Sequence, residues 1–78
     1  MREHLRTELA QVLGIAPQEI AGDESFEDLG LDSVLEIAFV HSLNMAYGLS
    51  ERRHIVDRYP TLDRLADYLA TVVPGRTP

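Results

Sequence analysis

The chain has 78 residues, of which 45% are hydrophobic and none is cysteine. This length fits one small domain that folds on packing alone, and the lack of cysteine excludes disulfides, thiolate metal sites and a cysteine nucleophile. Thirteen acidic residues against seven arginines give a net charge of −6 at pH 7, which disfavours nucleic acid as a partner because phosphate-backbone binders depend on clustered Lys and Arg.

The first predicted element is an amphipathic helix from about Glu3 to Leu13, ended by Gly14. Its apolar face consists of Leu5, Leu9, Val12 and Leu13. A long connection, 15–32, follows. We expect isolated apolar residues to hold it against the core, namely Ile20, Phe26, Leu29 and Leu31. A compact domain rarely tolerates so long a loop without a functional reason.

The central helix is predicted from Ser33 to Tyr47, with Gly48 as its C-terminal stop. Its N-terminus can be capped in two ways. Ser33 and Glu36 have the spacing of a capping box, whereas Asp32 in the capping role would leave the Ser33 hydroxyl free.

This central helix is apolar almost all round. We assign one arc to the core, consisting of Phe39, Val40, Leu43 and Tyr47. The opposite arc holds Val34, Ala38, His41 and Met45, and Leu35, Ile37 and Ala46 fill much of the remainder. A domain of this size leaves about 40% of its unfolded surface exposed. The second face therefore either packs under the long loop or forms a docking strip, and we favour the strip.

Two more helices complete the prediction. A short one runs from about Glu51 to Arg58, with Ser50 as its cap and Ile55 and Val56 as apolar anchors. The last begins at Leu62 after a Thr61 cap and carries one apolar stripe to Val73. Pro74 marks its stop, and we expect the tail, 74–78, to be disordered. No segment alternates with period two, so the fold class is all-α: a four-helix bundle of three longer helices and one short one.

The acidic residues are concentrated in one segment, residues 19–36, which contains no base. They are Glu19, Asp23, Glu24, Glu27, Asp28, Asp32 and Glu36. The other residues hold six acids and seven arginines, a net of about +1. This segment is either a solvated loop or a docking surface for basic partners, whose encounter it would accelerate.

The run Phe26-Glu27-Asp28-Leu29-Gly30-Leu31-Asp32-Ser33, followed by an apolar helix ending in Tyr47-Gly48-Leu49, resembles the acyl carrier protein family. The family signature is an Asp-Ser pair after a Leu-Gly-X turn, opening the second helix. The Tyr59-Pro60-Thr61-Leu62 junction and the helix with Leu65-Ala66-Asp67-Tyr68-Leu69 are similar to carrier domains of polyketide synthases. The resemblance covers about residues 3–73.

The resemblance implies that Ser33 is esterified with 4'-phosphopantetheine, which a magnesium-dependent transferase delivers from coenzyme A. Asp32 matches the acid that contributes to transferase recognition. The implied protein is a non-catalytic carrier that holds acyl groups as thioesters, and its partners are the phosphopantetheinyl transferase and a ketosynthase, acyltransferase or other acyl-processing enzymes. The expected partner surface is Glu27, Asp28, Asp32, Val34, Leu35, Ala38, His41 and Met45.

Some positions depart from the family pattern. Val34 replaces the usual Leu after the serine, and Leu35 and Ala38 stand at commonly acidic positions. These changes disfavour a fatty-acid-synthase role and favour partners that grip the helix through apolar contacts. Peptidyl carriers usually show Gly-Gly where this chain has Gly30-Leu31, but discrete aminoacyl or peptidyl carriers can share this feature and remain the alternative.

Three other functional classes can be compared with the sequence. An enzyme using Ser33 and His41 fails because eight helical residues separate them by about 12 Å, whereas a nucleophile and its base need roughly 3 Å. An EF-hand beginning at Asp23 would need Gly at Asp28 and Glu at Val34. His4 and His54 are taken as surface or packing residues. An unmodified protein-interaction module remains open.

Neither a membrane span nor a signal peptide is expected. No stretch approaches the roughly 20 apolar residues of a spanning helix, and no apolar run follows the opening Met-Arg-Glu-His. We therefore expect a cytoplasmic monomer formed by one carrier domain, 1–78. The initiating Met and the short tails favour a free-standing protein.

Overall fold

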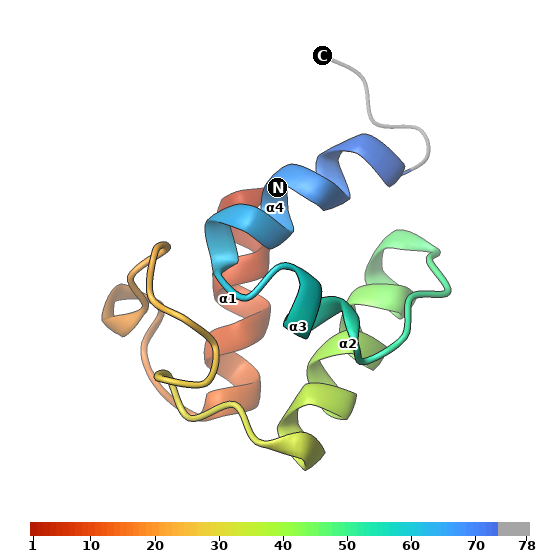
Figure 1. Cartoon of the computed structure of the whole chain (residues 1–78). Coiled ribbons are helices and arrows are strands. Elements are labelled where there is room, and N and C mark those ends of the chain that lie inside the picture. The colour runs from red at the N-terminus through yellow and green to blue at the C-terminus, as the bar shows by residue number, and fades with distance from the viewer. Residues whose placement is uncertain (74–78) are drawn as a thin grey trace.

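The computed structural model describes residues 1–73 and contains four α-helices and one short 3-10 helix (Figure 1). In chain order they are α1 (Arg2–Leu13), η1 (Pro17–Glu19), α2 (Ser33–Tyr47), α3 (Ile55–Arg58) and α4 (Leu62–Val72). The described residues contain no strand, only an isolated bridge between Ser25 and Thr61. The predicted all-α bundle of three longer helices and one short helix is confirmed. Pro74 and the tail, 74–78, lie outside the described residues.

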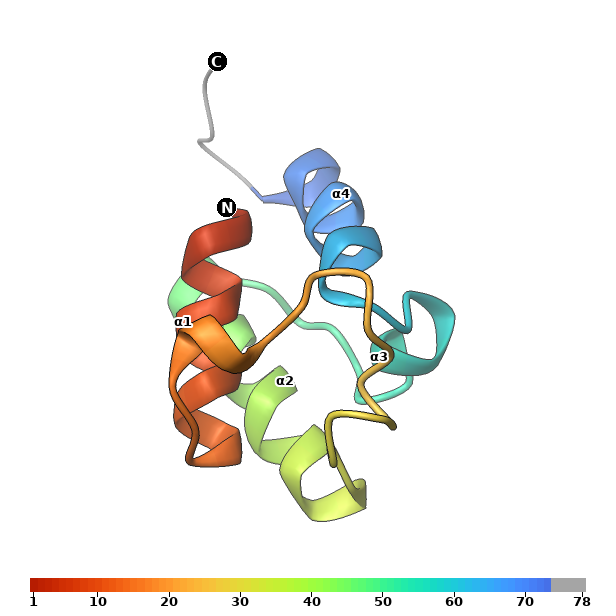
Figure 2. The same cartoon turned by 90° about the vertical axis from the view of Figure 1, so that its left-hand side faces the viewer.

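Helix α1 is the element against which the others are arranged. It contacts α2, α4 and η1, while α3 lies on the far side of α2 and α4 from α1 (Figure 2). The N-terminal end of α2 lies at the bottom of both ribbon views, far from the N-terminus of the chain. Within residues 1–73, no helix is long and apolar enough to cross a bilayer.

The apolar stripes of the helices meet in one core. Its largest fully buried side chains are Phe39, Leu5, Leu9, Leu62, Leu65 and Leu69. The long loop contributes Ile20, Phe26 and Leu31, each at most 5% exposed. These three residues anchor the loop as predicted, and burial of each large apolar side chain stabilises the fold by about 1.5–3 kcal/mol.

The helix ends follow the predicted chemistry. Gly14 and Gly48 end α1 and α2 with φ of 72° and 66°, values that favour glycine. The Thr61 side chain caps α4 by accepting a hydrogen bond from the Arg64 N–H at 3.2 Å. The short helix η1 was not predicted; its Glu19 carboxylate accepts a hydrogen bond from the Ala16 N–H at 2.9 Å.

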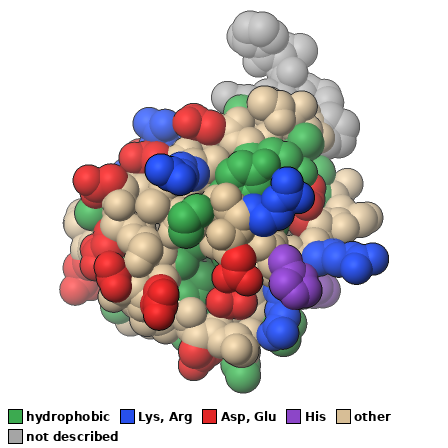
Figure 3. Space-filling model, in the orientation of Figure 1, with side chains coloured by type: hydrophobic (Ala, Val, Ile, Leu, Met, Phe, Trp, Pro, Cys, Tyr) green, Lys and Arg blue, Asp and Glu red, His purple; other side chains and the backbone are tan. Residues whose placement is uncertain are grey.

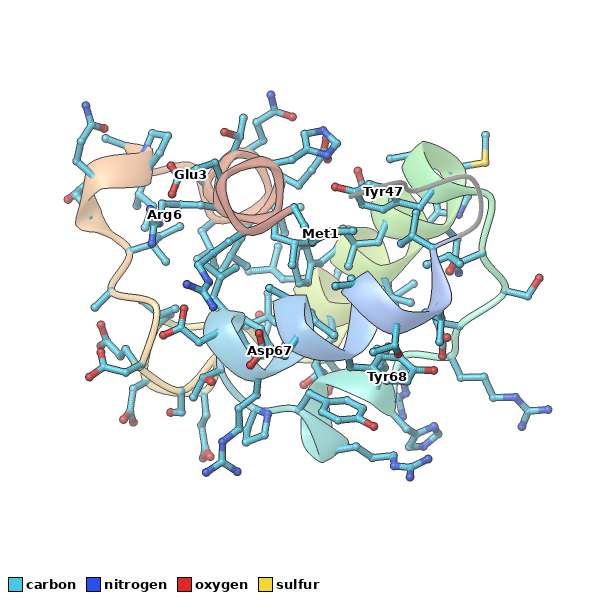
Figure 4. The ribbon with its side chains drawn as sticks, turned by 90° about the horizontal axis from the view of Figure 1, so that it is seen from above. Met1, Glu3, Arg6, Tyr47, Asp67 and Tyr68 are labelled. Carbon is cyan, nitrogen blue, oxygen red and sulfur yellow. The ribbon has the colours of Figure 1, made fainter. Side chains whose placement is uncertain are left out.

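Polar contacts join α1 to its neighbours. Arg2 pairs with Asp63 of α4 at 3.0 Å and lies 3.5 Å from Asp67. The Ser42 hydroxyl of α2 donates to the Glu8 carboxylate at 2.6 Å. Within α1 itself, Glu3 and Arg6 form an ion pair at 2.7 Å, and Figure 4 shows their side chains on the side of α1 that faces η1. Arg2 and Arg6 are thus both paired with acids.

The short third helix differs from its prediction. It begins at Ile55 rather than Glu51, and Ser50 does not cap it. The reason lies in α2, where the Asn44 side chain accepts from the Glu51 N–H and donates to the Glu51 carbonyl, both at 2.9 Å. The Glu51 carbonyl thus bonds to a side chain, and the backbone hydrogen bonds that lead into α3 begin only at the Arg52 carbonyl. Asn44 therefore fixes the α2–α3 loop against α2.

Candidate functional site

Ser33 is the first residue of α2 and is exposed. Asp32 is the N-cap, so the capping-box alternative with Ser33 as the cap is wrong. The Asp32 carboxylate accepts from the Leu35 N–H at 2.9 Å, and its backbone carbonyl accepts from the Glu36 N–H at 2.8 Å. A carboxylate is favoured here because it also interacts with the positive end of the helix dipole. The Ser33 side chain is left without a capping role.

The Ser33 hydroxyl makes no hydrogen bond with any other side chain or backbone group of residues 1–73. It shares the end of the helix with the backbone N–H groups of Ser33 and Val34, which have no intrahelical partner. An exposed alcohol beside such donors is accessible to an enzyme and can carry a negatively charged group.

A tight turn before Ser33 fixes its position. The Ser25 hydroxyl accepts from the Asp28 N–H at 3.1 Å, and the Leu31 N–H donates to the Phe26 carbonyl at 3.0 Å. Gly30 has φ of 96°, a conformation that glycine adopts without strain. Phe26 and Leu31 are both buried. Two core anchors therefore hold the turn, and the chain re-emerges at Asp32 and Ser33.

Phe26 also connects the turn to the rest of the fold. Its ring packs edge-on against Phe39 of α2, with centroids 5.8 Å apart. Its N–H donates to the Pro60 carbonyl, in the connection between α3 and α4, at 2.8 Å. The start of α2 is thus tied to both halves of the bundle.

A cleft of about 520 Å³ lies beside Ser33, between the turn, the start of α2 and α3. Its apolar walls are Phe26, Leu31, Val56 and Pro60, and its acidic ones are Glu27, Asp32, Glu36 and Asp57. No base lines it. Sequence reasoning missed Asp57, because no local pattern signals that α3 faces the start of α2.

Of the eight predicted partner residues, seven are exposed: Glu27, Asp28, Asp32, Val34, Ala38, His41 and Met45. Leu35 is half-buried and packs against the core. Ile37, which is 54% exposed, was not included. Its spacing with His41 and Met45, i, i+4 and i+8, is a signal that could have found it.

Two rival sites can be compared with the geometry. Ser33 and His41 lie on the same straight helix, eight residues apart, which separates them by about 12 Å along its axis. Within residues 1–73 no three His, Asp or Glu side chains gather as a metal ion would require.

The family model described as "Phosphopantetheine attachment site" matches residues 3–69. The chain belongs to this family. Its cofactor is accordingly 4'-phosphopantetheine, as predicted. The match covers the turn, all of α2 and α3 and most of α4, so it includes every residue of the site described above.

Large synthases contain similar segments. The chain is 40% identical over 72 residues to mycoketide-CoA synthase of Mycobacterium tuberculosis, covering 91% of this chain and 2% of that protein. It is 38% identical over 74 residues to polyketide synthase ThaG of Burkholderia thailandensis, covering 95% of this chain and 1% of that protein. The chain thus spans only a small part of these relatives. The predicted resemblance to carrier domains of polyketide synthases is confirmed.

Solved carrier structures share the fold. The HMG-ACPI domain from the CurA module of Lyngbya majuscula superposes with a TM-score of 0.87 at 35% identity, covering 92% of this chain and 73% of that one. A free-standing peptidyl carrier protein from Acinetobacter baumannii also gives 0.87, at 28% identity, covering 91% and 89%. Because acyl and peptidyl carriers superpose equally well, the backbone alone does not separate the two kinds of cargo.

Proposed function

We propose that this chain is a single acyl carrier domain, 1–78, that carries 4'-phosphopantetheine on Ser33 and presents acyl thioesters to enzymes of polyketide biosynthesis. The observation that carries the proposal is the exposed Ser33 hydroxyl, free of hydrogen bonds to the rest of residues 1–73, at the start of α2. The polyketide assignment is supported by the synthases to which the chain is similar.

The modification requires only that the Ser33 oxygen be reached. This oxygen forms a bond to the pantetheine-side phosphorus of coenzyme A, the pyrophosphate P–O bond breaks, and adenosine 3',5'-bisphosphate leaves. The hydroxyl proton passes to a base on the transferase, since the neighbouring Asp32 carboxylate is engaged as the cap of α2. Bound 4'-phosphopantetheine supplies the thiol that holds an acyl group as a thioester.

One feature of the surroundings of Ser33 favours a phosphodiester and one opposes it. The free N–H groups and the positive end of α2 stabilise a negative charge there. The Asp32 carboxylate opposes it, but solvent and salt screen this exposed pair of charges. We assign Asp32 a further role in recognition by the transferase, as the family resemblance implies. The Asp32 carboxylate would then help to attract a basic enzyme, which offsets its repulsion of the phosphodiester.

We propose that the carrier itself is non-catalytic and monomeric. We also propose that it is cytoplasmic, because its donor, coenzyme A, and its acyl-processing partners are expected in the cytoplasm. Ketosynthase and acyltransferase are the proposed partner classes besides the transferase. Neither a nucleic acid nor a membrane is proposed as a partner. The proposed docking surface comprises the predicted partner residues with Ile37 added.

A peptidyl or aminoacyl carrier is the alternative, and the polyketide synthases to which the chain is similar do not favour it. Gly30-Leu31, in place of the Gly-Gly usual in peptidyl carriers, favours the acyl assignment. The intact mass of the protein purified from its native producer separates the two, because it includes the bound cargo. An amino acid or peptide on the arm would exclude the acyl assignment.

The test of the modification is incubation with coenzyme A, Mg²⁺ and a broad-specificity phosphopantetheinyl transferase, followed by intact-mass spectrometry. We expect the protein to gain one phosphopantetheine group. A protein whose mass is unchanged with several such transferases would be an unmodified interaction module, and the proposal would be wrong.

Charge reversal in the acidic turn is expected to slow encounter with the transferase. Glu27 and Asp28 are exposed beside Ser33, so Glu27→Arg or Asp28→Arg should lower the rate of modification severalfold at low salt, where electrostatic attraction accelerates association. The measurement is the modification rate across a series of salt concentrations. The difference from the unchanged protein should shrink as salt rises, and a difference that is independent of salt would contradict long-range attraction.

Charges placed on the exposed strip of α2 are expected to weaken docking without unfolding the bundle. Met45 is 74% exposed, and Ala38 is exposed two turns before it on the same face of α2. Ala38→Asp or Met45→Glu should therefore lower kcat/KM for modification about tenfold, or about 1.4 kcal/mol. Ala70→Asp is the matched control, because Ala70 is exposed on α4. Circular dichroism checks the fold, and a loss of helicity would mean that the strip belongs to the core.

A further inference from the structure

The loop after α2 and helix α3 carry the opposite charge to the segment that leads into α2. Residues 19–36 contain seven acids and no base, whereas residues 52–58 contain three arginines and one acid. The three, Arg52, Arg53 and Arg58, are all exposed. Figure 3 shows acidic side chains over the left and lower centre of the face in view and Arg side chains at its upper left, while Arg and His side chains meet at its right-hand edge. The acidic segment and the three arginines are therefore two separate charged regions of the surface.

These three arginines are not neutralised within the described fold. Unlike Arg2 and Arg6, none of them forms an ion pair with a residue of 1–73. The adjacent acid, Glu51, is engaged elsewhere, since it accepts a hydrogen bond from the Tyr68 hydroxyl at 2.8 Å. That bond is the main cause that raises the pKa of Tyr68, with burial and the charge of Glu51 adding to it. The remaining acid, Asp57, lines the cleft beside Ser33.

Asn44 places this loop beside the exposed strip of α2. Its two hydrogen bonds to Glu51 hold the loop against the helix. Arg53 then lines a groove of about 300 Å³ together with Ile37, Val40, His41, Asn44 and Glu51. Because this lining runs from Ile37 to Asn44, Arg53 lies beside the middle of α2, next to the His41 of the strip. Eight residues separate Ser33 from His41, about 12 Å along the helix axis.

We propose that Arg52, Arg53 and Arg58 form a second docking surface, which binds a carboxylate-rich segment of the enzyme that docks on α2. The inference rests on the proposed function, because it concerns the partner of that same helix. Unpaired guanidinium groups favour carboxylates, which they bind in a bidentate geometry. The partner thus presents basic groups near Ser33 and acidic groups opposite the loop between α2 and α3.

The two charged regions give the interface a direction. A partner that spans both regions in this orientation finds complementary charges at each, whereas a partner turned the other way finds like charges at each, which is unfavourable. The apolar strip between them supplies contact area but has no polarity of its own. The arginine surface therefore selects the orientation that brings the enzyme's entrance to Ser33.

The test is a titration of the 15N-labelled, unmodified protein with a hexaglutamate peptide, followed by NMR at low salt. We expect the amide shifts to concentrate at residues 52–58 and at His41. Arg52→Gln with Arg53→Gln should raise the Kd about two- to fivefold for each arginine removed. Arg64→Gln is the matched control, because it removes an exposed arginine of α4 that also lacks an ion pair within 1–73.

An equal loss of binding in Arg64→Gln, or shifts spread evenly over every arginine, would overturn the proposal. Shifts at residues 52–58 that grow with protein concentration and without peptide would also overturn it, because they would assign the surface to the acidic segment of a second copy. The titration does not depend on Ser33. A protein that binds the peptide at 52–58 but never gains phosphopantetheine would contradict the proposed function and leave the second docking surface intact.

Discussion

Replacing Ser33 by alanine is expected to abolish uptake of phosphopantetheine while leaving the fold unchanged. The loss is complete because no other oxygen can take the place of the Ser33 hydroxyl at the start of α2. Stability should change by no more than about 0.5 kcal/mol, since the side chain is exposed and makes no hydrogen bond within residues 1–73. The measurements are the intact mass after incubation with coenzyme A and transferase, and the midpoint of thermal unfolding.

The other three serines provide the controls. Ser25 and Ser42 are half-buried, and their hydroxyls are already hydrogen-bonded, to the Asp28 N–H and to the Glu8 carboxylate. Ser50 is the closest match, because it is exposed in the loop after α2. Trypsin cleaves after Arg6 and next after Arg52, so all four serines lie in one peptide and single variants are needed to locate the group. Ser50→Ala should be modified at the normal rate. If this variant gained no phosphopantetheine on incubation, the assignment to Ser33 would be wrong.

The sequence was sufficient to predict the helices because their signals are local. The apolar spacing of α1 and α4 and the stops at Gly14 and Gly48 depend on residues close together in the chain. The start of α3 could not be predicted in this way. The Asn44 side chain, which belongs to α2, bonds to the backbone of Glu51, seven residues further along the chain. A contact of this kind leaves no periodic pattern in the sequence.

The position of Ser33 was predictable, but its surroundings were only partly so. The sequence permits either Asp32 or Ser33 as the cap, and burial of Leu31 decides between them, because it fixes where the chain leaves the core. Asp57 enters the cleft through the packing of α3 against the turn, which no motif encodes. Leu35 and Ile37 show the same limit, since a nearly all-apolar helix has no polar face to mark which side turns inward.

Phe39→Ala is expected to destabilise the protein by about 3–5 kcal/mol, because truncating a fully buried aromatic side chain leaves a cavity. Phe39 is 0% exposed and its ring packs against Phe26, which anchors the turn before Ser33. Small domains have only about 5–15 kcal/mol of stability in total, so the loss should be evident as a lower midpoint of urea unfolding. Modification of Ser33 should slow as well, since the turn loses its support.

Val34→Ala tests whether this effect belongs to one face of α2. Val34 is an apolar residue of the same helix but is 73% exposed, so its truncation should cost no more than about 0.5 kcal/mol. The two variants together separate the role of α2 in stability from its role in docking: one face supports the turn that presents Ser33, and the other remains available to a partner. Similar losses of stability in both variants would show that Val34 is packed, and the exposed strip would then be too short to dock an enzyme.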